Sequence, residues 1–304
     1  VSKKTLVLTI ANGQMGKSIQ KQWGAAPIHD CFHLLAFDKQ QLDITDLESL
    51  QHQLNNLKVD VIINAAAYTA VDAAQESEAN AELAYAINAH GPKNLARWAQ
   101  AADAKLIHIS TDFVFDGTAT SPYPIDAQPN PRGVYAASKL AGEQAVLEAL
   151  PNKAIVLRAS WLYSEYNSNF VKTMLGLLAT RESIAVVNDQ IGAPTSAGSL
   201  GEVLFNIAVS DNGNGIYHWS DDGSISWYDF AVAIQEEGIA AGLVAHSVPI
   251  NPITTDEYPT VAARPAYSVL DRSRTEADFT CTAPPWREQL KLVIQHLADR
   301  EQTH

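Results

Sequence analysis

Short runs of apolar residues alternate along the first half of the chain with longer segments in which apolar residues recur every three or four positions. The runs are typical of buried strands and the longer segments of amphipathic helices. Because the strands are apolar on both faces, they predict an α/β fold of the Rossmann type, a doubly wound parallel sheet covered on both sides. The pattern places strands at residues 5–10, 34–37, 61–64, 105–110 and 154–159, and helices at residues 14–23, 46–57, 73–102 and 135–150.

Local signals refine two of these helices. Thr45 is predicted to cap the helix at 46–57, with Glu48 as its capping-box partner. The segment 73–102 is expected to hold two helices with a break near Gly91 and Pro92, because proline disrupts a helix interior.

The second half of the chain is less regular. Helical patterns at 170–179, 200–209, 227–237 and 286–298 are separated by loops rich in Pro, Gly and Asp. We predict a dinucleotide-binding domain at residues 1–160. Residues 161–304 are predicted to form mainly a smaller α/β substrate-binding lobe, with some segments returning to pack on the first domain. Ligands of such sheets bind beyond the carboxyl ends of the strands, so the expected site is the cleft between the lobes.

Composition narrows the function classes. The chain has 304 residues, with 21 Lys and Arg against 34 Asp and Glu, which gives a net charge of −13. That charge argues against a general binder of nucleic acid or anionic membranes. Cys31 and Cys281 cannot form a disulfide framework, and no apolar run approaches the ~18 residues of a membrane span. We therefore expect a soluble, cytoplasmic protein.

The first predicted strand runs into a glycine-containing turn at residues 10–16 that opens a helix. Such a turn can lay a pyrophosphate on the helix N-terminus, where free N–H groups favour anions. A plain turn is the alternative, and Ile10 stands where a three-glycine fingerprint has its first glycine. A forced positive φ at Ile10 costs about 1–2 kcal/mol; a β-region φ instead shifts the backbone under the pyrophosphate. The candidate cofactor residues here are Asn12, Gly13, Gln14, Met15 and Gly16.

Asp38 follows the second predicted strand, about 20 residues beyond the glycines, where a ribose-binding carboxylate is expected. The alternative is an ordinary loop aspartate. The neighbouring Lys39 could meet a 2′-phosphate, so the choice between NADH and NADPH stays open.

Tyr135 and Lys139 are four residues apart and share one face of a predicted helix. A neighbouring ammonium lowers the pKa of a phenol, which is near ~10 when free, and suits the pair to acid–base chemistry. Ser110 and Thr111 end the preceding strand, where a hydroxyl can bind a substrate carbonyl. Together these residues predict reduction of a ketone; the alternative is a surface tyrosine beside a solvated lysine.

Other polar residues fit structural roles better. His108 and His218 lie in predicted strands and are expected to be core residues rather than ligands. Two acidic pairs on predicted helices are expected to lie on faces exposed to solvent; a Mg²⁺ site at these pairs is the less favoured alternative. The pairs are Glu76 with Glu78 and Glu236 with Glu237.

Several longer blocks make the chain resemble the extended short-chain dehydrogenase/reductase group and, within it, the dTDP-4-dehydrorhamnose reductase family. The resemblance covers almost the whole chain. The blocks are residues 64–72, 110–117, 135–143, 158–163, 169–170, 189–195 and 263–265.

The resemblance implies site residues. It implies that Thr111, Tyr135 and Lys139 are catalytic. It also implies a cofactor, NADPH or NADH, and a dianionic nucleotide-sugar substrate. Phe113 departs from the family, which usually has Tyr there, and so does Ile10. Implied cofactor contacts are Asp43 and Ile44 at the adenine and Ala65, Ala66 and Tyr68 near the nicotinamide; implied substrate contacts are Thr69, Val71, Thr111, Trp161, Asn169 and Arg264.

The function this implies is reduction of the 4-keto group of dTDP-4-dehydro-β-L-rhamnose. One alternative is a reductase for another nucleotide-linked 4-keto-6-deoxy sugar. The other is a non-catalytic protein like the regulatory subunit of methionine adenosyltransferase, which resembles this family. Metal use and the oligomeric state, including a homodimer, stay open.

Overall fold

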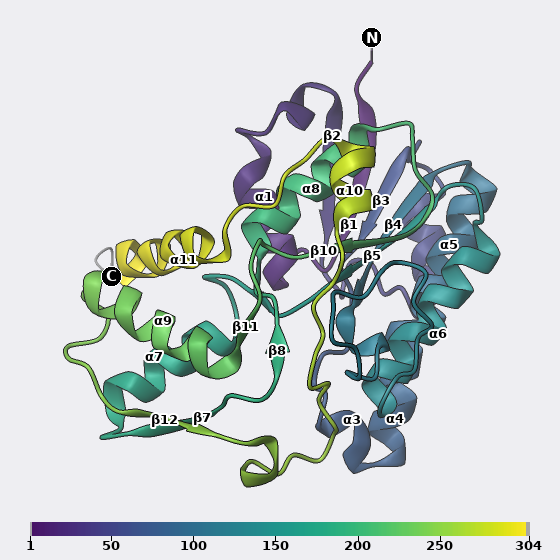
Figure 1. The fold of residues 1–304 in the computed structure, drawn as a ribbon. Helices are drawn as coiled ribbons and strands as arrows, with labels where there is room; N and C mark the ends of the chain where they lie inside the picture. Colours follow the sequence, from purple (N-terminus) through teal and green to yellow (C-terminus); the bar gives the residue numbers. More distant parts are fainter. Residues whose placement is uncertain (1, 302–304) are drawn as a thin grey trace.

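The computed structural model describes residues 2–301 and is built around a six-stranded sheet (Figure 1). The strand order is β10–β5–β4–β3–β1–β2, and every neighbouring pair is parallel. The predicted α/β class and its five strands are confirmed, and the strand predicted around His218 joins the same sheet as β10. The strands are β1 (Lys4–Thr9), β2 (Phe32–Phe37), β3 (Val61–Asn64), β4 (Lys105–Thr111), β5 (Ala154–Ala159) and β10 (Gly215–Trp219).

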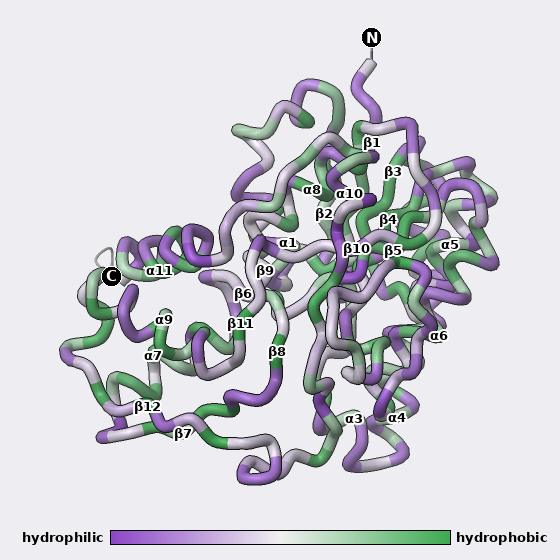
Figure 2. The backbone as a smooth tube through the Cα atoms, in the orientation of Figure 1, coloured by the Kyte–Doolittle hydropathy of each residue, from purple (hydrophilic) through white to green (hydrophobic). Residues whose placement is uncertain are grey.

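Helices cover both faces of this sheet, which explains why its strands are apolar throughout. In β1, Leu6 and Leu8 pack with α1 and α8 on one face, while Val7 packs with α2, α5 and α6 on the other. The inner strands β3 and β4 are mainly hydrophobic, with polar residues near their carboxyl ends (Figure 2). The helices are α1 (Gln14–Trp23), α2 (Leu47–Leu54), α5 (Gly91–Ala102), α6 (Val134–Ala149) and α8 (Ala197–Val209).

A smaller lobe holds most of the chain after residue 160. Its core is an apolar and aromatic cluster between α7, α9 and α11, next to the parallel pair β7–β12. The chain returns to the large sheet with α8, β10 and α10, so these segments lie with the first 160 residues (Figure 1). No helix within residues 2–301 is long and apolar enough to cross a membrane. The elements are α7 (Phe170–Thr180), β7 (Ile184–Val187), α9 (Trp227–Ala240), β12 (Ile250–Ile253), α10 (Ser273–Phe279) and α11 (Trp286–Glu301).

Short elements connect the two parts. The pair β6–β9 is parallel and the pair β8–β11 is antiparallel. They are β6 (Leu162–Tyr163), β8 (Ile191–Gly192), β9 (Thr195–Ser196) and β11 (Ile225–Ser226), with short helical turns at η1 (Pro27–Asp30), η3 (Asp112–Val114) and η4 (Thr255–Glu257).

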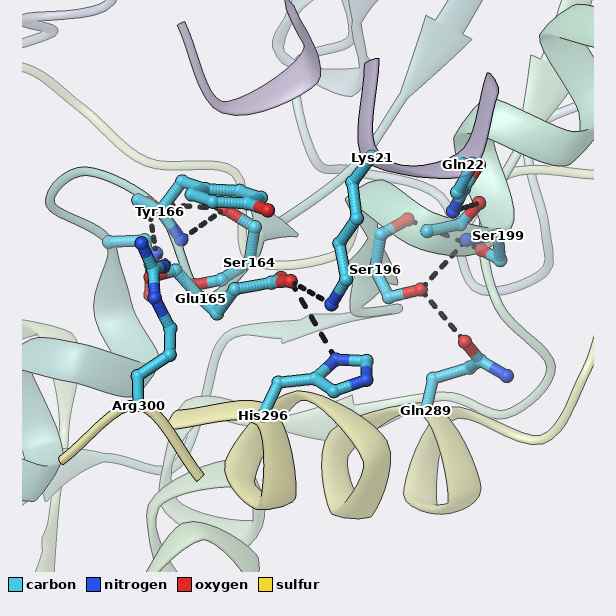
Figure 3. Close-up of polar contacts among 12 residues, drawn as sticks. Lys21, Gln22, Ser164, Glu165, Tyr166, Ser196, Ser199, Gln289, His296 and Arg300 are labelled. Atoms are coloured by element: carbon cyan, nitrogen blue, oxygen red, sulfur yellow. Dashed lines mark hydrogen bonds and ion pairs between the residues drawn. The ribbon is translucent and has the colours of Figure 1, made fainter. Parts of the chain in front are cut away.

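The carboxylate of Glu165 links the C-terminal helix to the first helix (Figure 3). This largely buried group accepts a hydrogen bond from Lys21 Nζ of α1 at 2.8 Å and lies 3.6 Å from His296 Nδ1 of α11. Nearby, Ser196 Oγ donates to Gln289 Oε1 of α11 at 3.0 Å. Polar contacts therefore hold α11 close to α1 and to the start of α8.

The predicted start of α2 is wrong. Asp46 rather than Thr45 caps the helix, and its carboxylate accepts from the backbone N–H of Glu48. Thr45 is held outside the helix because its N–H and hydroxyl both donate to Asp43 Oδ1. The helix also ends earlier than predicted, at Leu54.

The predicted break near Gly91 and Pro92 is also wrong. The break lies at Ser77, which is extended and caps α4 (Glu78–Tyr85) after the short α3 (Ala73–Glu76). From α4 the chain continues through a π-helical turn, η2 (Ala86–His90), into α5, whose first turn contains Pro92. Proline is tolerated there because a first-turn residue needs no intrahelical N–H donor. Gly91 serves packing, since a Cβ on it would lie 2.6 Å from the Ile44 side chain.

Candidate active site

A cavity of about 410 Å³ lies at the carboxyl ends of the sheet strands, against α7 and α9. An adjoining cavity of about 730 Å³ shares Val71, Phe113, Phe170 and Trp227 with it. The first cavity brings together ten of the predicted site residues: Gln14, Met15, Ala65, Thr69, Val71, Thr111, Tyr135, Lys139, Trp161 and Asn169.

Tyr135 and Lys139 lie on the first turns of α6, where both line the cavity. Lys139 is buried, and its Nζ donates to the Ile109 carbonyl at 2.7 Å. Burial lowers the pKa of Lys139 to about 8, and the negative charge of Glu143 opposes that shift. The ammonium is therefore held at the cavity wall with a fixed orientation.

The predicted lowering of the Tyr135 pKa by Lys139 does not occur in this structure. Burial raises the pKa of Tyr135 to about 12, and the hydrogen bond with Thr111 only partly opposes it. The negative charge of Asp112 raises it further. Desolvation dominates because it penalises the phenolate directly. The phenol is protonated at neutral pH, the form that can deliver a proton.

The hydroxyl of Ser110 is not available to a ligand. It donates to Glu143 Oε1 at 2.5 Å, and Glu143 in turn binds the buried guanidinium of Arg158. Of the two hydroxyls at the end of β4, Thr111 is therefore the one that can serve a ligand in the cavity.

Asn88 is a site residue that the sequence did not indicate. Its side chain accepts from the Tyr68 N–H and donates to the Tyr68 carbonyl, at 2.8 and 3.1 Å. It also donates to Ser138 Oγ, which donates to the carbonyl of Tyr135. Gly142 allows this approach, since a Cβ there would lie 2.0 Å from the Asn88 carbonyl oxygen. An asparagine within an apolar helical segment was the only signal.

The two buried histidines are core residues, as predicted. His108 Nδ1 lies 3.0 Å from Asn64 Nδ2, and burial, helped by Lys139, holds the pKa of His108 well below its usual range. Its Nε2 has no hydrogen-bond partner within residues 2–301. His218 contacts the Tyr123 carbonyl, and burial lowers the pKa of His218 to about 3. Both rings are neutral at pH 7.

The turn between β1 and α1 has the shape of an anion cradle. Gly13 is the N-cap of α1 and gives it no side-chain cap, so the first-turn N–H groups are open to an anion. A Cβ on Gly16 would lie 2.2 Å from the carbonyl oxygen of Ile10, so only glycine fits there. Ile10 has a φ of 55°, which is the strained route of the two expected. The turn therefore fits a dinucleotide pyrophosphate despite this strain.

Replacing Ile10 with glycine is expected to tighten NADPH binding about tenfold, if about 1.4 kcal/mol of strain is recovered when the turn closes on the ligand. The measurement is a titration of NADPH fluorescence against both proteins. The chemistry that depends on Tyr135 should be unaffected. Equal dissociation constants for the two proteins would show that the isoleucine is accommodated without cost to the cofactor.

The remaining predicted cofactor residues lie outside the cavity wall. Asp38 accepts from Gln40 N and Gln41 N and lies 3.4 Å from Asn12 Nδ2. Asp43 holds Thr45. Ile44 and Ala66 are buried and Tyr68 is half-buried; all three lie beyond the ends of the strands.

Trp161 lies two residues beyond the end of β5 and has a φ of 46°. Its ring stacks on Trp227 with a centroid distance of 3.5 Å, and a Cβ on Gly192 would lie 2.4 Å from its indole. A positive φ at a bulky residue is costly and is concentrated at ligand sites. The backbone, Trp227 and Gly192 thus fix the position of the Trp161 indole in the cavity wall.

Two predicted substrate residues are engaged within the protein. Asn169 caps α7 and donates to Gln14 Oε1 at 3.1 Å and to the Ser164 carbonyl at 2.7 Å. Arg264 lines the larger cavity, where its two terminal nitrogens bind the carboxylate oxygens of Asp72, each at 2.6 Å. This pairing holds the pKa of Asp72 down at about 2.

Metal ligands are not gathered at any point in the described chain. Residues 2–301 contain no group of three or more His, Cys, Asp or Glu side chains arranged to hold an ion. Glu236 and Glu237, considered for Mg²⁺, both form ion pairs with Arg287. Glu76 and Glu78 are exposed.

The fold and the cavity with its tyrosine, lysine and threonine define a Rossmann-type reductase. The chain belongs to the family described as the RmlD substrate binding domain, which it matches over residues 4–299. It is 40% identical over 293 residues to the dTDP-4-dehydrorhamnose reductase of Aggregatibacter actinomycetemcomitans, covering 95% of this chain and 97% of that one. The resemblance found in the sequence is thereby confirmed.

Solved structures agree with this assignment. A dTDP-4-dehydrorhamnose reductase from Clostridium acetobutylicum is 39% identical, with a TM-score of 0.87 and coverage of 96% of this chain and 99% of that chain. One from Bacillus anthracis, in complex with NADP, is 38% identical, with a TM-score of 0.86 and coverage of 97% and 100%.

Proposed function

We propose that this chain reduces the 4-keto group of dTDP-4-dehydro-β-L-rhamnose to give dTDP-L-rhamnose, with NADPH or NADH as reductant. The observation that carries the proposal is the meeting of Thr111, Tyr135 and Lys139 in one cavity, in a chain whose relatives are named for this reaction. The NADP in the Bacillus anthracis structure supports NADPH as a reductant.

The chemistry divides between the cofactor and the chain. The bound dinucleotide supplies a hydride to C4 of the sugar. The protonated phenol of Tyr135 gives its proton to the carbonyl oxygen as negative charge develops there. Thr111 donates a hydrogen bond to the same oxygen, and Lys139 orients the cofactor ribose. The Lys139 ammonium is buried and donates to the Ile109 carbonyl, which fixes its orientation for this contact.

We assign the cofactor to the turn of residues 12–16, with Asp38 at the ribose, Asp43 and Ile44 at the adenine, and Ala65, Ala66 and Tyr68 toward the nicotinamide. The open N-terminus of α1 and the close approach allowed by Gly16 support this assignment.

We assign the sugar to the smaller cavity, with Thr69, Val71, Thr111 and Trp161 around it, and the nucleotide to the larger one. This agrees with a substrate lobe at residues 161–304, because α7 and β7 supply much of the larger wall. The charge of Arg264 is neutralised by Asp72, and the side chain of Asn169 caps α7. Both residues therefore shape the cavity walls rather than bind the substrate's charge. Arg181 lines the larger cavity and is the better candidate for the substrate's negative charge.

The direct test is oxidation of NADPH or NADH by the purified protein with dTDP-4-dehydrorhamnose made in situ, followed by absorbance. Substrate-dependent oxidation and formation of dTDP-L-rhamnose are expected. Turnover of a different 4-keto-6-deoxy sugar nucleotide, with none of this one, would reassign the substrate. Binding of a methionine adenosyltransferase without any turnover would support the non-catalytic alternative instead.

Trp161 provides a test of the sugar site. Replacing it with alanine is expected to lower kcat/KM by about tenfold, because the sugar loses an aromatic face worth about 1 kcal/mol or more. Trp161→Phe keeps such a face and is the matched control. Kinetics and thermal melting are compared. If Trp161→Ala is strongly destabilised yet binds the sugar nucleotide normally once folded, Trp161 is a core residue only.

We also propose that the protein acts in the cytoplasm. Its two cysteines, Cys31 and Cys281, are unpaired, which supports a reducing compartment. A homodimer stays a prediction, to be checked by light scattering.

A further inference from the structure

Asp112 is a buried carboxyl group at the edge of the active-site cavity. It follows Thr111 directly and opens the turn η3, and only 2% of its surface is exposed. Its Oδ1 accepts from Thr111 Oγ1 at 3.2 Å, whereas its Oδ2 has no hydrogen-bond partner within residues 2–301. A buried carboxylate oxygen without a partner is costly, so this environment favours the neutral acid.

The Thr111 hydroxyl has one proton to donate and two lone pairs to accept with. One lone pair already accepts from the Phe113 N–H at 3.2 Å. If Asp112 is ionised it can only accept, so the single Thr111 proton points at Asp112 and none is left for the cavity. If Asp112 is protonated it donates to the second lone pair. The Thr111 proton is then released from Asp112 and can point at Tyr135 or, when the substrate is bound, at its keto oxygen.

The groups around Asp112 are few. Tyr135 of α6 faces it closely enough that the two interact electrostatically. Hydrogen bonds from Ser268, Thr111 and the backbone N–H groups of Asp112 and Phe113 stabilise its charged form, but burial outweighs them and raises the pKa of Asp112 to about 7. Lys139 lines the same cavity, and its Nζ donates to the Ile109 carbonyl. Burial lowers the pKa of Lys139, and the negative charge of Glu143 opposes that shift. The protonated acid is therefore accessible at neutral pH.

We propose that Asp112 is a positioning residue that, as a protonated acid, donates to Thr111 Oγ1 and thereby directs the Thr111 hydroxyl at the keto oxygen of the substrate. The inference rests on the proposed function. No covalent step is involved, and Asp112 keeps its proton throughout. On this proposal, activity falls at alkaline pH because Asp112 loses its proton, and not because the catalytic tyrosine does.

The test compares the pH dependence of kcat/KM for the wild type, Asp112→Asn and Asp112→Ala. The wild type should lose activity above pH 7, about tenfold per pH unit, as Asp112 ionises. An asparagine amide can donate to Thr111 as the acid does and never ionises. Asp112→Asn should therefore shift this loss toward pH 8, where Lys139 titrates. Asp112→Ala removes the donor, and kcat should fall about tenfold with little change in KM.

Asp221 offers a matched control. It is also fully buried, and burial raises the pKa of Asp221 to about 7, but it binds Ser196 and Ser199 away from the cavity. Asp221→Asn should leave the wild-type pH profile in place. An Asp112→Asn profile that matches the wild type would assign the alkaline loss to Lys139 and overturn the proposal. Equal impairment of Asp112→Asn and Asp112→Ala would overturn it too.

A readout without substrate separates this proposal from the proposed function. The infrared difference spectrum of wild type against Asp112→Asn should contain a carboxylic-acid C=O band at pH 6 that disappears as the pH rises through 7. If the wild type does not turn over the sugar but the band titrates in this way, the proposed function fails and the protonated acid stands. If the band is missing at pH 6, Asp112 is ionised and cannot donate to Thr111.

Discussion

Replacing Tyr135 with phenylalanine is expected to lower kcat by about 10²–10⁴ while leaving cofactor affinity largely unchanged. The ring still packs edge-on against Phe113, as in the native protein, so the loss is confined to the hydroxyl. Without that hydroxyl the keto oxygen loses the proton donor that the proposed mechanism assigns to it. The measurement is steady-state kinetics with the sugar nucleotide, together with an NADPH titration.

Tyr217 supplies a control for this change. It is a buried tyrosine on β10, and its hydroxyl donates to Asp278 at 2.8 Å, away from the cavity. Tyr217→Phe removes a hydroxyl of the same kind and should cost stability of about 1 kcal/mol without affecting kcat. Near-native turnover by Tyr135→Phe would rule out Tyr135 as the acid.

The sheet could be predicted from the sequence because its strands are short, apolar and regularly spaced, and because a helix follows each of them. The same holds for the Tyr135–Lys139 pair, since a four-residue spacing on a helix fixes a shared face without any tertiary information. At Ile10 the sequence left two backbone conformations open, a strained positive φ and a β-region φ, and the structure decides for the first.

Features that depend on distant segments could not be predicted. Asp72 and Arg264 are 192 residues apart in the chain, and nothing local to either indicates the pair. Pro92 indicated a break in the helix, but the chain instead passes through the π-helical turn that holds Asn88 and continues into α5 without a break. The pKa of Tyr135 was predicted in the wrong direction because desolvation depends on burial, which a spacing rule does not contain.

The second large effect concerns the buried ion pair behind the site. Glu143 and Arg158 are each about 1% exposed, and Arg158 Nη2 donates to Glu143 Oε2 at 2.6 Å. Arg158 also lies over the Phe115 ring and 3.4 Å from His218 Nε2, a ring that is neutral and cannot replace the carboxylate. The pair ties α6, which holds Tyr135 and Lys139, to β5, the strand next to the edge strand β10.

Glu143→Ala is expected to reduce the free energy of unfolding by about 3–5 kcal/mol, because it leaves the arginine as an uncompensated buried charge that cannot lose its proton. Replacing both partners with apolar residues, as in Glu143→Leu with Arg158→Met, should cost less than the single change, since no charge is then left behind. Urea unfolding of the three proteins measures the difference. If the double variant is the less stable one, the pair stabilises the fold by its own attraction, and the penalty of an orphaned charge is not what governs the single variant.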